Sequence, residues 1–199
     1  MHPSLQRRME RLFSFFDTNN DNILSGEEDF TPLATEITNR RFPDDGPLHR
    51  KLYRYLHDTF IAENARRDLA GKGFVDLVVF LHSHEYINQM AHERPEESKA
   101  FVNKAAGDFF RLLDKDHDGW LELDDIKIYA SGHHHDGPWI TSNFKTICHR
   151  LGRDELRISR AEFLMLIWEY WFNPDDSCLG AHLLGDPVMP APFVAADDV

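Results

Sequence analysis

Residues 17–28 read DTNNDNILSGEE, a run dense in side-chain oxygens with Leu24 among them. A hard cation such as Ca²⁺ takes about six to eight oxygen ligands, and one helix–loop–helix unit supplies them from loop positions 1, 3, 5, 7, 9 and 12. Position 6 needs a positive φ, which Asn22 tolerates, and position 8 carries the apolar Leu24. A surface turn rich in Asp and Asn is the alternative. The spacing favours a metal loop, with ligands Asp17, Asn19, Asp21, the Ile23 carbonyl, Ser25 and Glu28.

The same pattern returns in DKDHDGWLELDD, residues 114–125, with Gly119 at position 6 and Leu121 at position 8. Its predicted ligands are Asp114, Asp116, Asp118, the Trp120 carbonyl, Glu122 and Asp125. Two independent matches identify an EF-hand protein. Asp125 is one methylene shorter than the usual Glu, so we expect Mg²⁺ to compete with Ca²⁺ in this loop. In the first loop, Phe30 comes one residue later than the apolar residue that usually follows position 12.

Each of these loops needs a partner, and two degenerate copies provide one. DLAGKGFVDLVV (68–79) keeps the apolar Val75 at position 8, and LGRDELRISRAE (151–162) keeps Ile158. Lys72 and Arg153 stand where ligands belong and would repel a cation. We therefore expect no calcium in loops two and four, and β-bridges that join Leu24 to Val75 and Leu121 to Ile158.

The flanking helices suggest that the two degenerate loops also differ in length. Phe60 and Ile61 lie about three residues too early for the usual incoming helix, which predicts a stretched second loop. Leu151 reads as the last core residue of its helix, which predicts a fourth loop one residue short.

The sequence thus predicts an all-α fold, with four EF-hand helix–loop–helix units in two pairs that form one compact globule with short β-bridges between paired loops. Residues 1–92 form the N-terminal pair, with the first hand active and the second degenerate. Residues 93–176 form the C-terminal pair, with the third hand active and the fourth degenerate. Residues 177–199 are a tail that packs on the core and is then disordered. Helices are expected over 4–16, 27–41, 47–66, 76–91, 95–113, 123–131, 138–150 and 160–171.

Composition restricts the partners of this 199-residue chain. The net charge of −12 argues against nucleic acid and anionic membranes. No apolar run approaches the roughly 18 residues of a membrane span, and the N-terminal residues lack the apolar core of a signal peptide. Cys148 and Cys178 are too few for a disulfide framework and are expected to be buried thiols. A cytoplasmic monomer is the expectation.

The C-terminal stretch EYWFNPDDSCLGAHLLGDP (169–187) carries a more specific likeness. Over residues 5–186, the chain resembles the sarcoplasmic calcium-binding protein and calexcitin group, cousins of the calcium-regulated photoproteins and luciferin-binding proteins. The resemblance rests on four hands, a long first interval and the pattern of Gly180, Leu183 and Gly185 after an aromatic helix end. It implies a C-terminal segment packed over the core. It does not extend to bioluminescence, because the fourth loop is degenerate and no His precedes Trp168 or Trp171 by one turn.

Two groups of histidines are candidates for further sites. Three adjacent histidines in a glycine-flanked loop cannot easily converge on one transition-metal ion, so His133, His134 and His135 are expected to be solvated. The histidines at 57, 82 and 84 are expected to be satisfied core residues, with a ligand cavity as the alternative. The aromatic residues at the last helix end are likewise expected in the core: Trp168, Tyr170, Trp171 and Phe172.

These observations predict a calcium-binding protein, a cytosolic buffer or signal modulator with two ions. No catalytic motif is evident, so it is not expected to be an enzyme. The alternative is a luciferin-binding-like carrier or a ligand-dependent enzyme on the same scaffold, with an apolar small molecule as partner and calcium in a structural role. A protein partner is also compatible with the first hypothesis.

Overall fold

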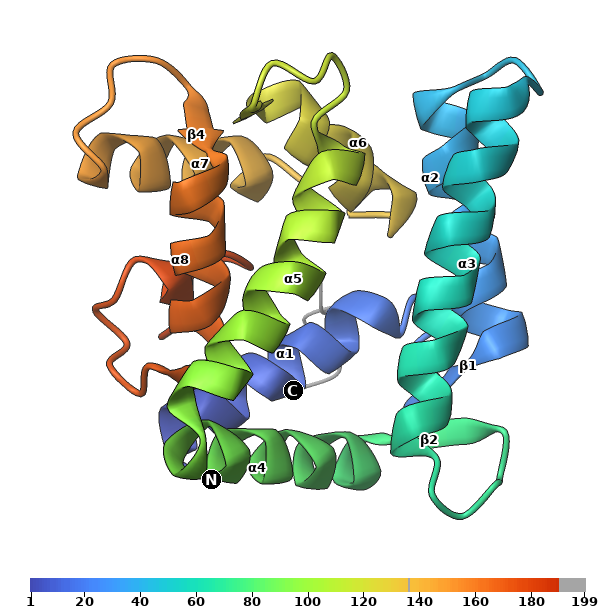
Figure 1. Ribbon diagram of the computed structural model, residues 1–199, viewed down its shortest axis with the longest axis vertical. Helices are drawn as coiled ribbons and strands as arrows, with labels where there is room; N and C mark the ends of the chain where they lie inside the picture. The colour runs from blue at the N-terminus through green and yellow to red at the C-terminus, as the bar shows by residue number, and fades with distance from the viewer. Residues whose placement is uncertain (136, 190–199) are drawn as a thin grey trace.

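Both predicted loop pairings form in the computed structural model, which describes residues 1–135 and 137–189. Strand β1 (Ile23–Ser25) pairs antiparallel with β2 (Phe74–Asp76), and Leu24 lies opposite Val75. Strand β3 (Trp120–Glu122) pairs with β4 (Arg157–Ser159), and Leu121 lies opposite Ile158. These four apolar residues are fully buried, so each pair of loops is fastened from within. The two pairings lie at opposite corners of the molecule (Figure 1).

The helices follow the predicted pattern closely. In the described residues there are eight α-helices: α1 (Pro3–Phe16), α2 (Thr31–Arg41), α3 (Pro47–Arg67), α4 (Leu77–Glu93), α5 (Pro95–Leu113), α6 (Leu123–Gly132), α7 (Trp139–Arg150) and α8 (Arg160–Phe172). The exception is the helix expected over 27–41. It begins as a π-helical turn, η1 (Gly26–Phe30), and becomes α-helical at Thr31, with Pro32 in the first turn of α2.

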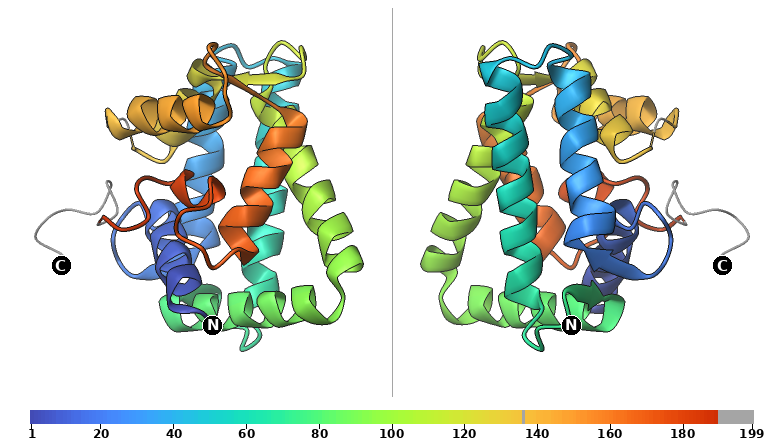
Figure 2. Two further views of the ribbon diagram at one scale, coloured as in Figure 1. Left: turned by 90° about the vertical axis from the view of Figure 1, so that its left-hand side faces the viewer. Right: turned by 90° about the vertical axis from the view of Figure 1, so that its right-hand side faces the viewer.

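The core has two centres, one under each pair of loops. The N-terminal centre is built around Met9, Phe13 and Phe80, and the C-terminal centre around Phe110 and Phe163. Partly buried Tyr129 and Leu183 pack against both centres. Helix α2 packs on α6, and α1 on α8, so apolar contacts run across the boundary between the pairs (Figure 2).

The tail lies against α1 and α8 as far as the structure describes it. The buried Arg8 guanidinium donates to the carbonyls of Asn173 and Asp175, at 2.5 and 2.8 Å. Arg11 donates to the Leu184 carbonyl at 2.8 Å. A short 3₁₀ helix, η2 (Gly180–His182), packs on α8. The disorder predicted for the end of the chain falls on residues 190–199, which lie outside the described residues.

The prediction of a stretched second loop is wrong. Helix α3 runs to Arg67 and β2 begins at Phe74, the same interval as from α1 to β1. Asn64 and Arg67 stand at the positions before the second loop that Phe13 and Phe16 occupy before the first. Buried Asn64 donates to the Leu24 carbonyl at 3.0 Å, and Arg67 lies over the Phe80 ring.

The prediction of a fourth loop one residue short is wrong for the same reason, because α7 ends at Arg150 and β4 begins at Arg157, again the same interval. Leu151 caps α7 and packs on the core, as expected.

Two simpler expectations can be compared with the described residues. Cys148 and Cys178 are both unpaired and buried. None of the described helices is both long and apolar enough to cross a membrane.

Candidate metal centre

The first loop is held by its own side chains in a shape that turns its oxygens inward. Asp17 caps α1 and is buried, and its carboxylate accepts the backbone N–H groups of Asp21 and Asn22 at 3.2 and 3.0 Å. The Asp21 carboxylate accepts the Ile23 N–H at 2.9 Å. Asn22 has φ +64°, the positive value that position 6 requires. Asn19 accepts the Asp21 N–H at 3.1 Å, so four predicted ligand residues lie in one closed turn.

The π-helical turn changes which acid completes this loop. A π turn fits one extra residue into a helix, and here the Thr31 N–H donates to the Gly26 carbonyl five residues earlier. As a result, Asp29 rather than Glu28 turns back toward the loop, and it accepts the Ser25 N–H at 2.7 Å. Glu28 is exposed, and only its backbone N–H reaches the Ser25 hydroxyl. The structure therefore places Asp29 where the sequence count placed Glu28.

The environment of Asp29 fits a bound cation. Its side chain is 1% exposed, and Oδ1 is buried without a hydrogen-bond partner in the part of the chain that the structure describes. Burial, followed by the charges of Asp17, Asp21 and Glu28, raises the pKa of Asp29 to about 6, although the Ser25 N–H opposes this. A buried carboxylate among other acids is costly unless a positive charge compensates it.

The sequence contains a signal for the extra residue between the first loop and its outgoing helix. Phe30, one residue later than usual, is buried against Phe16 and Phe60, with ring centroids 5.9 and 5.5 Å away. The extra residue in η1 is what lets Phe30 reach this core. The late apolar residue was thus the signal of a thirteen-residue loop that ends at Asp29.

The third loop brings three of its predicted ligands together. Carboxylate oxygens of Asp114, Asp116 and Asp118 lie within 4.8 Å of one another. Asp114 is buried; one of its oxygens accepts the Gly119 N–H at 3.1 Å, and Oδ1 has no hydrogen-bond partner among the described residues. Gly119 has φ +87°. The unpartnered Asp114 oxygen is the second feature that fits a cation.

The remaining predicted ligands of the third loop lie at its exit. Trp120 begins β3, and its N–H donates to Asp118 at 2.8 Å. Glu122 is exposed and caps α6, and its N–H donates to Asp125 Oδ2 at 3.1 Å. Asp125 is not part of the carboxylate group formed by the three aspartates, and its Oδ1 is paired with Arg41 at 2.9 Å.

The second and fourth loops carry cationic side chains, as predicted. In the fourth loop, the Arg153 guanidinium pairs with Glu162 at 2.8 Å, so a side-chain charge sits on the acid at position 12. The Arg153 and Arg157 guanidinium carbons also lie 4.6 and 4.5 Å from the Trp120 ring centroid. In the second loop, Lys72 lies over the Phe74 ring. Neither loop offers a cluster of acids.

The expectation of a solvated histidine loop is wrong for His133. Its side chain is 0% exposed, its ring centroid is 4.1 Å from that of Phe15, and Nδ1 lies 3.2 Å from the Phe15 carbonyl. His135 is half-buried beside the same carbonyl, whereas His134 is exposed. The end of α6 docks onto α1 at this point, so the histidines fasten two elements together.

The second histidine group divides as well. His84 is buried, and its Nδ1 lies 3.0 Å from the Phe80 carbonyl. Burial, together with the charge of Arg67, lowers the pKa of His84 to about 3. His57 is half-buried against Tyr53, but His82 is exposed, so the core prediction is wrong for His82. In the aromatic group, Tyr170 is buried and the other three residues are partly buried.

Comparison with known proteins gives structures but no sequence family. No family model matches the chain, and no curated protein matches it. Among solved structures, the coelenterazine-binding protein of Renilla muelleri in its calcium-loaded apo form has a TM-score of 0.69 at 18% identity, over 94% of this chain and 99% of that one. An amphioxus sarcoplasmic calcium-binding protein has a TM-score of 0.64 at 16% identity, over 93% and 98%.

This chain has the EF-hand fold. Calcium-loaded apo-aequorin from Aequorea victoria is a further neighbour, with a TM-score of 0.60 at 15% identity over 88% of this chain and 94% of that one. The chain spans 99%, 94% and 98% of the lengths of the coelenterazine-binding protein, apo-aequorin and the amphioxus protein, respectively. At these identities the likeness concerns the fold.

Proposed function

We propose that this chain binds two calcium ions, one in loop 17–29 and one in loop 114–125, and acts as a calcium buffer or signal modulator. The observation that carries the proposal is a pair of buried carboxylate oxygens, one on Asp29 and one on Asp114, that lack hydrogen-bond partners within the described residues. In the third loop, carboxylate oxygens of Asp114, Asp116 and Asp118 lie within 4.8 Å of one another; in the first loop, Asp17 accepts the Asp21 N–H, and the charges of Asp17 and Asp21 act on Asp29. A calcium ion would supply the positive charge that such a cluster lacks.

The residues that would hold the first ion are those of the first loop, with one exchange. Asp17, Asn19, Asp21, Ile23 and Ser25 stay as predicted from the sequence, and Asp29 takes the place of Glu28. The third loop would use Asp114, Asp116, Asp118, Trp120 and Glu122, and Asp125 once it is released from Arg41. We propose two sites and not four because the other two loops carry positively charged side chains. Lys72 lies in the second loop, and Arg153 is paired with Glu162 in the fourth.

The cavities favour calcium binding over a small-molecule carrier, although one neighbour is a coelenterazine-binding protein. A hollow of about 460 Å³ lies against α3, but charged side chains such as Asp45, Arg50 and Asp58 line it, so it does not suit an apolar ligand. The apolar pocket between the two pairs of hands has a free volume of about 10 Å³ and is lined by Leu52, Leu56 and Tyr129, among others. Ligand pockets usually hold about 300 Å³ or more. The interior at this place is filled by side chains, which favours the calcium-binding hypothesis.

The experiment is a calcium titration of the chelator-treated full chain and its loop variants. Asp17→Ala and Asp114→Ala should each remove one tight site, and the double variant should remove both. A double variant that still binds calcium tightly would refute the two-loop proposal. An apolar molecule that co-purifies in stoichiometric amount, seen by native mass spectrometry, would favour the carrier instead.

A further inference from the structure

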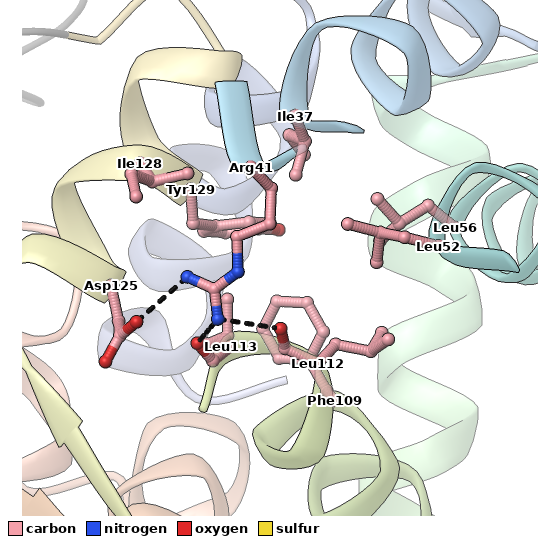
Figure 3. A pocket seen from close by; sticks show the side chains of 10 residues that line it. All are labelled: Ile37, Arg41, Leu52, Leu56, Phe109, Leu112, Leu113, Asp125, Ile128 and Tyr129. Atoms are coloured by element: carbon pink, nitrogen blue, oxygen red, sulfur yellow. Dashed lines mark hydrogen bonds and ion pairs between the residues drawn. The ribbon is translucent and has the colours of Figure 1, made fainter. Parts of the chain in front are cut away.

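Arg41, the last residue of α2, joins the two pairs of hands at the third loop. Its side chain is 4% exposed, and Nη1 lies 2.9 Å from Oδ1 of Asp125, whose side chain is 12% exposed. Its other amino group donates to the carbonyls of Leu112, at 3.3 Å, and Leu113. Figure 3 shows the guanidinium reaching from α2 between Asp125 and these two carbonyls. A residue of the first hand thus occupies the entrance and the exit of the third.

The contact engages the acid at position 12 of the third loop. Oδ1 of Asp125 faces Arg41, and Oδ2 accepts the Glu122 N–H, so both of its oxygens already have partners. Asp114 differs, because one of its oxygens is buried without a partner in the described chain. In the first half of the third loop, Asp114 thus has an oxygen free to bind a cation, whereas Asp125 at the end of the loop is paired with the Arg41 guanidinium.

The other hands show that this arrangement is particular to the third. In the first hand, Asp29 accepts the Ser25 N–H and keeps a second oxygen unpartnered within the described residues. In the fourth, Arg153 pairs with Glu162 from within the same loop. The third hand has the acids of an active loop, but its last acid is neutralised as in a degenerate loop, and the arginine comes from the other pair.

We propose that Arg41 is an affinity-determining residue for the third site, an internal cation that competes with a divalent ion for Asp125. This inference rests on the proposed function. A carboxylate oxygen that accepts a charge-assisted hydrogen bond from Arg41 is less available as a ligand, and the nearby positive charge also repels a second cation. Binding in the third loop must therefore weaken the contact between α2 and Asp125. By reciprocity, the position of α2 sets the affinity of the third loop.

The test is a double-mutant cycle in the full chain, with the first site disabled by Asp17→Asn so that calcium titration reports on the third. Arg41→Gln removes the charge but keeps a hydrogen-bonding side chain, and it should raise the calcium affinity by about tenfold, the usual size of a hydrogen bond to a charged group. In the Asp125→Asn background, the same change should alter the affinity by less than about threefold. Arg40→Gln is the matched control, because this neighbour is paired with Glu36 on the surface and should have no effect.

Three results separate the possibilities. If Arg41→Gln melts at a lower temperature but binds calcium as before, or has the same effect in both backgrounds, Arg41 is only structural and the inference is wrong. If the third loop binds no calcium even in the folded Arg41→Gln variant with Asp125 unchanged, the proposed function fails for that loop.

A second measurement serves if Arg41→Gln does not fold. In the otherwise unaltered chain, the side-chain NMR signal of Arg41 should shift when calcium fills the third loop. A signal that stays in place would overturn the inference.

Discussion

Neutralising Asp29 should have opposite effects on the calcium-free and calcium-bound protein. The folded-state pKa of Asp29, about 6, lies above its ordinary value of 3.8, so the ionised carboxylate at pH 7 destabilises the calcium-free fold. A difference of about two units corresponds to about 3 kcal/mol. Asp29→Asn should raise the free energy of unfolding of the calcium-free protein by about 2 kcal/mol, because it removes this cost but weakens the hydrogen bond to Ser25 by about 1 kcal/mol. For a chain of this length that is a rise in melting temperature of about 4–8 °C in EDTA.

In calcium the same substitution should be harmful, because it removes a charged ligand. The affinity of the first site should fall by about tenfold or more, which is about 1.4 kcal/mol or more. Glu28→Gln is the matched control: Glu28 is adjacent and exposed, so both states should change little. The assay is calorimetric titration with thermal melts in EDTA and in calcium. If Glu28→Gln weakens calcium binding and Asp29→Asn does not, the first loop has twelve residues and the reasoning from η1 is refuted.

Three further predictions concern the tail, pH and metal choice. Arg8→Met should lower the unfolding free energy by about 3 kcal/mol, because it removes the hydrogen bonds that the buried Arg8 guanidinium donates to partly buried carbonyl groups at Asn173 and Asp175. Arg7→Met, at a half-exposed neighbour, should cost less than about 1 kcal/mol. Equal losses in denaturant titrations would show that the Arg8 contacts do not hold the tail. The pKa of His84 in the fold, about 3, lies below its unfolded value of about 6.5. The contribution of buried His84 to the free energy of unfolding is therefore complete above pH 6.5 and falls by about 2 kcal/mol by pH 5. His84→Gln should remove that pH dependence, and an unchanged dependence would contradict the burial of His84. Asp125→Glu should make the third site more selective for Ca²⁺ over Mg²⁺, because a longer acid can give two oxygens to the larger ion; competition titration with millimolar Mg²⁺ that shows no change would refute this.

Most of the fold could be predicted because its signals are local and repeated. Leu24, Val75, Leu121 and Ile158 mark the paired loops in the sequence, and all four pair as predicted. In the third loop, spacing also predicted that Asp114, Asp116 and Asp118 would lie together, and their carboxylates do. A periodic signal of this kind needs no knowledge of what lies across the molecule.

The features that sequence could not give depend on contacts between distant segments. The count of ligands placed Glu28 at position 12, and the late Phe30 points to Asp29 only once Phe30 is seen to pack on Phe16 and Phe60. Nothing distinguishes three adjacent histidines until α1 buries the first of them, His133.

The engagement of Asp125 was hidden for the same reason. Its partner Arg41 lies 84 residues earlier in the chain and in the other pair of hands. A loop pattern reads only the residues within the loop, so it reports the acids but not the distant charge that holds one of them.

Native mass spectrometry of the chelator-treated protein during a calcium titration counts the ions bound by each chain, and so tests whether two of the four hands bind calcium. We expect two ions per chain at saturation, one after Asp17→Ala or Asp114→Ala, and none at the same calcium concentration in the double variant. Three or more specifically bound ions, or two ions that survive both substitutions, would contradict it.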